Sequence, residues 1–427
     1  MLKKYFPFLE WISNYRSDYF KRDLLAGITV AVLLIPQGMA YALIAGLPPI
    51  YGLYAALTPQ IVYAFLGTSR QLAVGPVAMD SLLVAAGLSA LAIVEPSQYI
   101  QMAILLALLM GAIQLLLGLF RMGFIVSFLS KPVISGFTSA AAIIISFSQL
   151  KHLLGIQLSQ SNQLHIVIES ILQSNVPVHF ATLIIGVLSA VLILVIKNWN
   201  RKIPSALIAV VLGISWVYFN GLDKQGVAVV GLIPQGLPSF QTPVFEIDTI
   251  KQLFPTALTL ALVAFMEAIS VAKAIEEKHK EYTVDPNQEL IALGSSNIVG
   301  SFFQSYPATG GFSRTAVNDQ AGAKTGMAAL ITALMVGLTL MFFTHWFYYL
   351  PKAVLASIII VAVVNLIDLK FAIRLYKKRK DEFAILVVTF LATLFLGITE
   401  GIVLGIVISL LLLVYRASKP HHAFLGR

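Results

Sequence analysis

Cysteine is absent from the 427-residue sequence, and charged residues make up only 11% of it. The missing cysteine excludes disulfide bonds, thiolate catalysis and cysteine-ligated metal centres. A soluble domain carries roughly 25% charged residues, so a chain this poor in charge and 58% hydrophobic cannot cover its apolar surface in water. The mean hydropathy of +0.86 therefore indicates an integral membrane protein.

Other chemical signatures are also missing. The seven histidines lie mostly in loops without metal-ligand spacing, and the sequence shows no Gly-rich phosphate loop and no catalytic triad. The formal charge of +9 comes from Lys and Arg placed between apolar runs, and these are not interleaved with stacking aromatic residues as in a strand-binding groove. We expect no enzyme activity, no cofactor, no metal site and no nucleic-acid partner.

Apolar runs near the ~20 residues needed to cross a hydrocarbon core recur along the chain and form two sets of seven. The predicted fold is an all-α polytopic membrane protein with about 14 transmembrane segments in a 7+7 inverted repeat. The first set covers residues 24–43, 50–66, 76–91, 99–119, 125–149, 178–197 and 204–219. The second covers residues 253–274, 286–302, 312–322, 325–345, 351–366, 383–397 and 400–416.

These runs predict three regions and a topology. Residues 1–23 form a cytoplasmic tail, residues 24–416 form a transmembrane domain with repeats at about 24–219 and 253–416, and residues 417–427 follow the last apolar run. With both termini in the cytoplasm, Arg314 lies at membrane depth and the other basic residues lie mostly inside, which agrees with the positive-inside rule. We read the basic loop 370–382 as a topology anchor. The exceptions, on the outer side, are Lys151, Lys224, Lys251 and Lys352.

Two segments interrupt the pattern at corresponding places, each ahead of the third run of its set. Residues 67–75 end in Gly75-Pro76, and residues 303–311 end in Gly310-Gly311. Because seven segments invert the second repeat, the two short helices that follow are expected to point their N-termini at the same midplane spot. Helix N-termini present free N–H groups and positive dipole ends, so the pair predicts an anion site, although such glycine-bearing breaks also serve helix packing.

Three ionisable residues fall near this spot. Arg314 follows the second break, and an arginine at this depth is costly unless it faces a wet cavity or a partner. Glu267 lies in an otherwise apolar helix, where a carboxyl group is suited to binding and releasing a proton; the alternative is a structural ion pair with Arg314. Asp80, one turn into the third segment, is interpreted as structural or pH-responsive.

Five motifs follow one another along the chain: Pro36 to Tyr41, Pro48 to Tyr54, Gly67 to Ala78, Ser313-Arg314 with Gly322 and Lys324, and Leu350 to Leu355. As an ordered set they resemble one family, the sulfate permease (SulP) anion transporters, over nearly the whole chain. The resemblance implies a core subdomain that moves against a gate subdomain with the anion held between the third and tenth helices. The final residues resemble the family's linker into a cytoplasmic STAS domain, at which point the sequence stops.

The resemblance also implies the site residues and the function. We expect an inner cell membrane homodimer that takes up sulfate with a proton by alternating access. Open alternatives are a bicarbonate or dicarboxylate carrier, coupled to protons or sodium or acting as an exchanger, a nucleobase permease, and a passive anion channel. Glu267 is the expected proton-coupling residue, and the expected substrate-binding residues are Gln37, Tyr41, Val77, Ala78, Phe312, Ser313 and Arg314.

Overall fold

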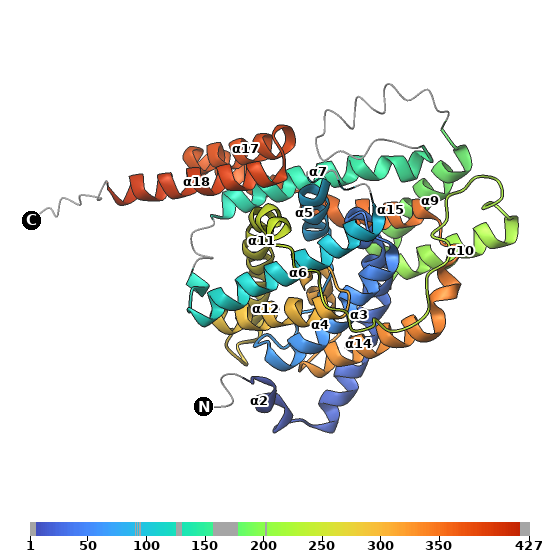
Figure 1. Cartoon of the computed structure of the whole chain (residues 1–427), viewed down its shortest axis with the longest axis horizontal. Helices are drawn as coiled ribbons and strands as arrows, with labels where there is room; N and C mark the ends of the chain where they lie inside the picture. The colour runs from blue at the N-terminus through green and yellow to red at the C-terminus, as the bar shows by residue number, and fades with distance from the viewer. Residues whose placement is uncertain are drawn as a thin grey trace, which may run out of the picture.

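The computed structural model describes residues 6–89, 91, 93, 95–124, 130–156, 178–200 and 203–418, and these form an almost entirely helical protein (Figure 1). Excluding the short α2 at the N-terminus, the first set of helices agrees with the predicted spans to within a few residues, except that α3 begins seven residues earlier than predicted and α7 both begins and ends later. It comprises α2 (Phe8–Ile12), α3 (Ser17–Ile44), α4 (Pro49–Leu66), β1 (Val74–Gly75), α5 (Ala78–Ser89), α6 (Pro96–Leu119), α7 (Lys131–Leu154), α9 (Phe180–Trp199) and α10 (Ser205–Asn220).

The second set repeats the order of the first. Its third helix, α13, is again short and again follows a two-residue strand. The set comprises α11 (Ile247–His279), α12 (Pro286–Phe302), β2 (Thr309–Gly310), α13 (Phe312–Gln320), α14 (Met327–Leu338) with η2 (Thr339–Phe343) and η3 (Thr344–Phe347), α15 (Lys352–Val363) with η4 (Val364–Leu366), α16 (Leu369–Lys378), α17 (Lys380–Phe395) and α18 (Ile398–Ala417).

Among the described helices, six are long and apolar enough to cross a membrane by length and composition. The half-helices α5 and α13 are too short to cross alone, as the sequence predicted. The predicted anchor loop contains the helix α16, which carries basic residues in its last turn and exposes Leu369, Ile373 and Tyr376. The six long helices are α3, α6, α7, α9, α11 and the stretch Met327–Phe347.

The helices pack into two groups. The core group consists of α3 to α6 and α11 to α14, and the gate group consists of α7, α9, α10, α15, α17 and α18. Helices α7, α17 and α18 run side by side along one edge of the molecule (Figure 1). Contacts of α3 with α10 and α15, and of α5 with α7 and α18, join the two groups.

Glycine allows the closest approaches inside the core group. A Cβ on Gly52 of α4 would lie 1.9 Å from the carbonyl oxygen of Gly38 in α3. A Cβ on Gly294 of α12 would lie 2.5 Å from the backbone nitrogen of Leu115 in α6. Helix backbones touch at both crossings, so no larger residue fits there without moving a helix.

A buried carboxylate ties α12 to the end of α4. Glu289 is fully buried, and its Oε2 accepts a hydrogen bond from the Tyr63 hydroxyl at 2.7 Å. Its Oε1 accepts from the backbone nitrogen and hydroxyl of Thr68, at 2.7 and 2.6 Å, and from the Ser69 nitrogen at 3.1 Å. Both oxygens are therefore satisfied inside the protein, and the cluster fixes the start of the segment that leads to β1.

A second buried carboxylate, Asp23, fastens the start of α3 to the loop before α14. It accepts hydrogen bonds from the backbone nitrogens of Lys324 and Thr325, at 2.6 and 3.1 Å, and from the Thr325 hydroxyl at 2.6 Å. The Tyr15 hydroxyl also donates to it, at 3.3 Å. Burial, together with the nearby Asp23 carboxylate, raises the pKa of Tyr15 to about 12, so the phenol keeps its proton and remains a donor.

Candidate functional site

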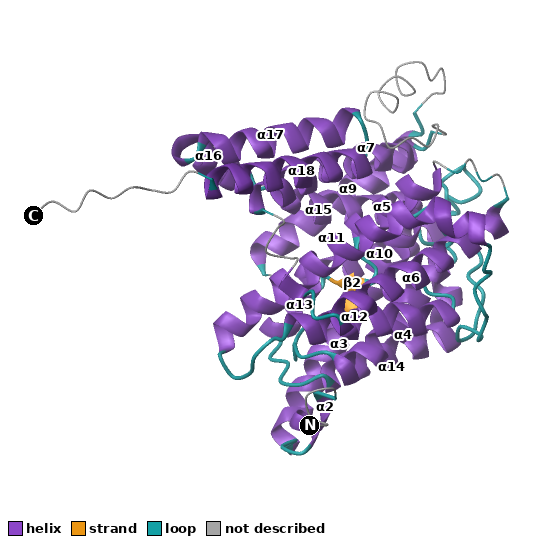
Figure 2. Cartoon of the chain, turned by 60° about the vertical axis from the view of Figure 1, so that its left-hand side comes forward, coloured by secondary structure: helices purple, strands orange, loops and turns teal. Residues whose placement is uncertain are grey.

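The two interrupted segments meet at the centre of the molecule. Strand β1 pairs antiparallel with β2, with Val74 opposite Gly310 and Gly75 opposite Thr309. Figure 2 shows β2 in the middle of the helices, beside α12 and α13. Glycine at Gly75 and Gly310 leaves these backbones free of side chains, and both short helices leave this small sheet within a few residues. The two breaks, far apart in the sequence, therefore build one structure.

Side chains from neighbouring helices hold this sheet in place. The amide of Asn297 in α12 both donates to the Ala308 carbonyl and accepts from the Ala308 nitrogen, each at 2.9 Å. The Thr309 hydroxyl donates to the carbonyl of Ala264 in α11 at 2.8 Å. The Thr315 hydroxyl accepts from the Ala73 nitrogen at 3.1 Å. These contacts fix where α13 begins.

The N-termini of α5 and α13 start from this sheet. Helix α5 begins at Ala78, so Val77 lies just ahead of its first turn. Helix α13 begins at Phe312 after Gly311, and no side chain caps it. The first N–H groups of a helix have no partner within that helix, so both ends offer donors and positive dipole ends.

Arg314 joins the two helix starts. It is only 2% exposed, and its Nη1 donates to the carbonyl oxygen of Pro76, two residues before α5, at 2.7 Å. Its Nε and Nη2 have no hydrogen-bond partner among the described residues. A buried guanidinium with unsatisfied donors beside two helix N-termini is suited to holding an anion.

Glu267 faces a cavity in the same region. The cavity has a volume of about 60 Å³, enough for several water molecules. Core helices line it through Met79, Glu267 and Phe312, and α7 of the gate group lines the other side. Glu267 forms no ion pair with Arg314 in the described part of the chain, so the structure does not contain the fixed pair that the sequence left open.

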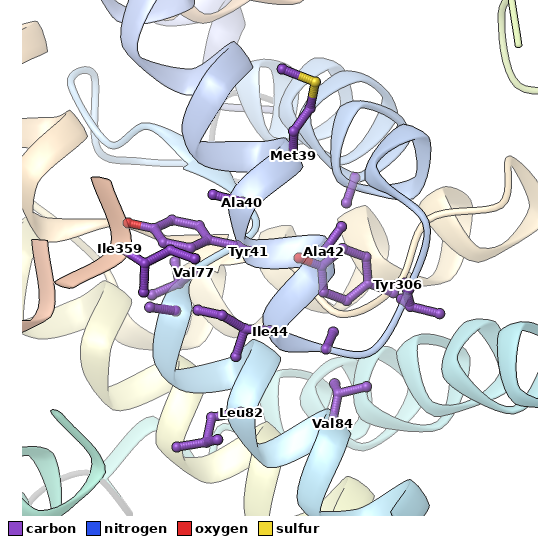
Figure 3. Close-up of a cluster of buried hydrophobic side chains, with 14 of the residues drawn as sticks. Met39, Ala40, Tyr41, Ala42, Ile44, Val77, Leu82, Val84, Tyr306 and Ile359 are labelled. Atoms are coloured by element: carbon purple, nitrogen blue, oxygen red, sulfur yellow. The ribbon is translucent and has the colours of Figure 1, made fainter. Parts of the chain in front are cut away.

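The structure brings most of the predicted site residues together. Tyr41 is close enough to Arg314 and Glu267 to interact electrostatically with both. Its ring lies beside Val77 and beside Ile359 of α15, at the boundary between the core and gate groups (Figure 3). Gln37, on the same helix, is 8% exposed, and its side-chain oxygen has no hydrogen-bond partner among the described residues.

The remaining predicted residues differ in exposure. Ala78 is buried in the first turn of α5, whereas Phe312 is 47% exposed and Ser313 is also exposed at the start of α13. The ring of Phe312 reaches the cavity wall. Arg314, the next residue, is buried because each residue of α13 is rotated by about 100° from the one before it, which turns its side chain toward the interior.

Sequence reasoning missed Tyr306. This residue is fully buried, its hydroxyl lies 3.0 Å from the Ser81 hydroxyl of α5, and it interacts electrostatically with Arg314 and Asp80. Figure 3 shows its ring beside Ala42 of α3. A tyrosine inside a glycine-bearing break at membrane depth is a signal that could have identified it, because its hydroxyl requires a partner there.

Comparison with known proteins agrees with this arrangement. The profile of the sulfate permease family matches residues 20–389. The chain belongs to the sulfate permease family. It is 43% identical to the chloroplastic sulfate transporter 4.1 of Arabidopsis thaliana, over 99% of the chain and 62% of that relative. It is 38% identical to the sodium-independent sulfate anion transporter of Bos taurus, over 98% of the chain and 73% of the relative.

Solved structures show the same fold. The murine Solute Carrier 26 family member A9 anion transporter in the inward-facing state matches with a TM-score of 0.90 and 31% identity, over 96% of this chain and 71% of that one. The transmembrane domain of a cyanobacterial bicarbonate transporter matches with a TM-score of 0.79 and 24% identity, over 93% and 98% of the chains, and bears on the fold alone. The predicted 7+7 inverted repeat with two midplane half-helices is confirmed.

Proposed function

We propose that this chain is the transport domain of a secondary active anion transporter that moves sulfate together with a proton by alternating access. The observation that carries the proposal is Arg314, which is buried between two helix N-termini with two donor nitrogens unsatisfied in the described structure. The named sulfate transporters among its relatives support sulfate as the anion. The chain spans 62% of the length of the first of these relatives, so regions outside it complete those proteins.

The charges around the site support proton coupling. Glu267 lines the cavity, its Oε2 has no hydrogen-bond partner among the described residues, and Arg314 acts on it electrostatically. When a sulfate dianion approaches, a proton on Glu267 removes one negative charge from the site. When the anion leaves, the carboxylate can release that proton. A channel needs no such titratable partner.

The two helix groups support alternating access. The cavity lies between α5, α11 and α13 of the core group and α7 of the gate group. Movement of the core group against the gate group would change the side of the membrane from which an anion reaches Glu267 and Arg314.

We further propose an inner cell membrane location, both termini in the cytoplasm, and a homodimer. In this proposal the N-terminal tail is residues 1–23, the transport domain is residues 24–416, and the linker to a further domain is residues 417–427. Residues 419–427 of this linker lie outside the described structure.

The test is uptake of radiolabelled sulfate into proteoliposomes. An inward proton gradient is expected to drive accumulation, and Arg314→Ala is expected to abolish it, whereas Lys251→Ala, which removes an exposed cation, is expected to transport normally. Unlabelled bicarbonate and fumarate serve as competitors. If sulfate is not accumulated whereas labelled bicarbonate or fumarate is, that anion would replace sulfate in the proposal.

Coupling is tested separately with Glu267→Gln. The quantity measured is the sulfate ratio, which is the internal sulfate concentration divided by the external one when net uptake stops. Because the amide cannot carry the proton, the sulfate ratio reached for a given pH difference is expected to fall by about tenfold per pH unit. A variant that reaches the wild-type ratio would show that Glu267 does not couple protons. Sulfate-dependent current with no proton flux would indicate a passive channel instead.

A further inference from the structure

Asp80 is a buried carboxylate for which the described structure supplies no partner. It lies in the first turn of α5 and is 0% exposed, and neither carboxylate oxygen accepts a hydrogen bond among the described residues. Glu289 and Asp23 are equally buried, yet several donors surround each of them. Because an isolated buried carboxylate is strongly disfavoured, Asp80 requires a proton or a passing partner for part of the transport cycle.

The groups that face Asp80 come from four places. Glu267 of α11 and Arg314 of α13 act on it electrostatically. Tyr306, bonded to the neighbouring Ser81, interacts with it from the segment before β2, and Tyr41 of α3 belongs to the same electrostatic cluster. The described parts of α6, α7 and α18 also pack against α5, and they bring no charged group to act on Asp80.

The charges in this cluster match a dianion in only one protonation state. Arg314 contributes one positive charge, and the N-termini of α5 and α13 contribute about half a charge each, which gives about two positive charges. Sulfate carries two negative charges. The site is therefore balanced when both Glu267 and Asp80 are neutral, and each ionised acid adds one uncompensated negative charge to the occupied site.

We propose that Asp80 is a second proton carrier, so that two protons move with each sulfate dianion. The inference rests on the proposed function, in which Glu267 carries the first proton. A proton from the side of higher acidity forms an O–H bond with the Asp80 carboxylate as sulfate binds. The same bond breaks on the other side as sulfate leaves. The transported charges then sum to zero.

The decisive measurement is the sulfate ratio at zero net flux in proteoliposomes, with the membrane potential held at zero by potassium and valinomycin. Each coupled proton multiplies the ratio by about tenfold per pH unit, so the wild type is expected to reach about 100-fold per unit. Asp80→Asn and Glu267→Gln are each expected to reach about tenfold, and the double variant is expected to show no pH-driven accumulation. Asp248→Asn, which removes an exposed carboxylate, is the matched control and is expected to keep the wild-type ratio.

A second measurement compares the wild type with Asp80→Asn under an imposed membrane potential. With two protons per sulfate, an imposed inside-negative potential is expected to leave pH-driven uptake unchanged, whereas Asp80→Asn, which brings in net negative charge, is expected to be slowed. A wild-type ratio near tenfold per pH unit, or an Asp80→Asn ratio equal to that of the wild type, would overturn the proposal and leave proton-coupled transport intact. The proposed function itself would fail if the wild type showed no pH-driven sulfate accumulation.

Discussion

Glu289 and Asp80 are both fully buried carboxylates on core helices, but their surroundings are opposite. Glu289 accepts four hydrogen bonds from Tyr63, Thr68 and Ser69, and Asp80 accepts none among the described residues. The satisfied carboxylate lies where a loop must be held, and the unsatisfied one lies where two half-helices meet. In our proposal, the difference separates a carboxylate that stabilises the fold from one that is completed by a proton when the anion binds.

The largest predicted effect concerns Arg314, the buried cation that lies in the same electrostatic cluster as Asp80. Arg314→Lys keeps the charge but loses the planar fork that reaches the Pro76 carbonyl while leaving two nitrogens for an anion. The loss of one charge-assisted hydrogen bond and of anion contacts is expected to lower the initial rate of sulfate uptake by about 100-fold. The rate is measured in proteoliposomes with equal amounts of folded protein. A rate near that of the wild type would show that charge alone, rather than geometry, is needed.

The next effect concerns stability. Glu289→Gln replaces a carboxylate oxygen by an amide group that cannot accept from all of its present donors. Thermal unfolding in detergent is expected to show a loss of about 2 to 3 kcal/mol. The sulfate ratio reached per pH unit by the protein that remains folded is expected to be unchanged. An unaltered unfolding temperature would mean that this network contributes little to the fold.

The smallest effect has the opposite sign. Asp80→Asn removes a carboxylate that has no partner in the described structure, so its unfolding free energy is expected to stay equal or to rise by about 1 kcal/mol. The same thermal assay, run beside Glu289→Gln, measures it. Destabilisation as large as that of Glu289→Gln would place Asp80 among the structural carboxylates, and the two residues would then no longer differ in role.

The repeat and the meeting of the two interrupted segments were predictable because each leaves a strong local signal. Apolar runs of membrane-crossing length mark the helices, and glycine-bearing breaks mark α5 and α13. Arg314 could be predicted as a candidate substrate-binding residue because a cation inside an apolar segment has few purely structural roles. The sequence also placed Glu267 in the same region, although it left open whether the two residues form a fixed ion pair.

Pairwise geometry could not be read from the sequence. The pairing of β1 with β2 joins segments more than two hundred residues apart, and no periodicity encodes it. The isolation of Asp80 depends on which donors its neighbours direct elsewhere, as Ser81 and Tyr306 do by bonding to each other. The helix α16 was missed because its short amphipathic stretch resembles a basic loop by charge alone.

In our proposal, sulfate and protons together complete the unsatisfied groups of the midplane site. The most direct measurement is isothermal titration of the purified protein with sulfate in buffers of different ionisation enthalpy, which counts protons taken up on binding. We expect sulfate binding to take up protons near neutral pH, Glu267→Gln and Asp80→Asn each to take up fewer protons, and Arg314→Ala not to bind sulfate. Sulfate binding with no proton uptake in any buffer would contradict it.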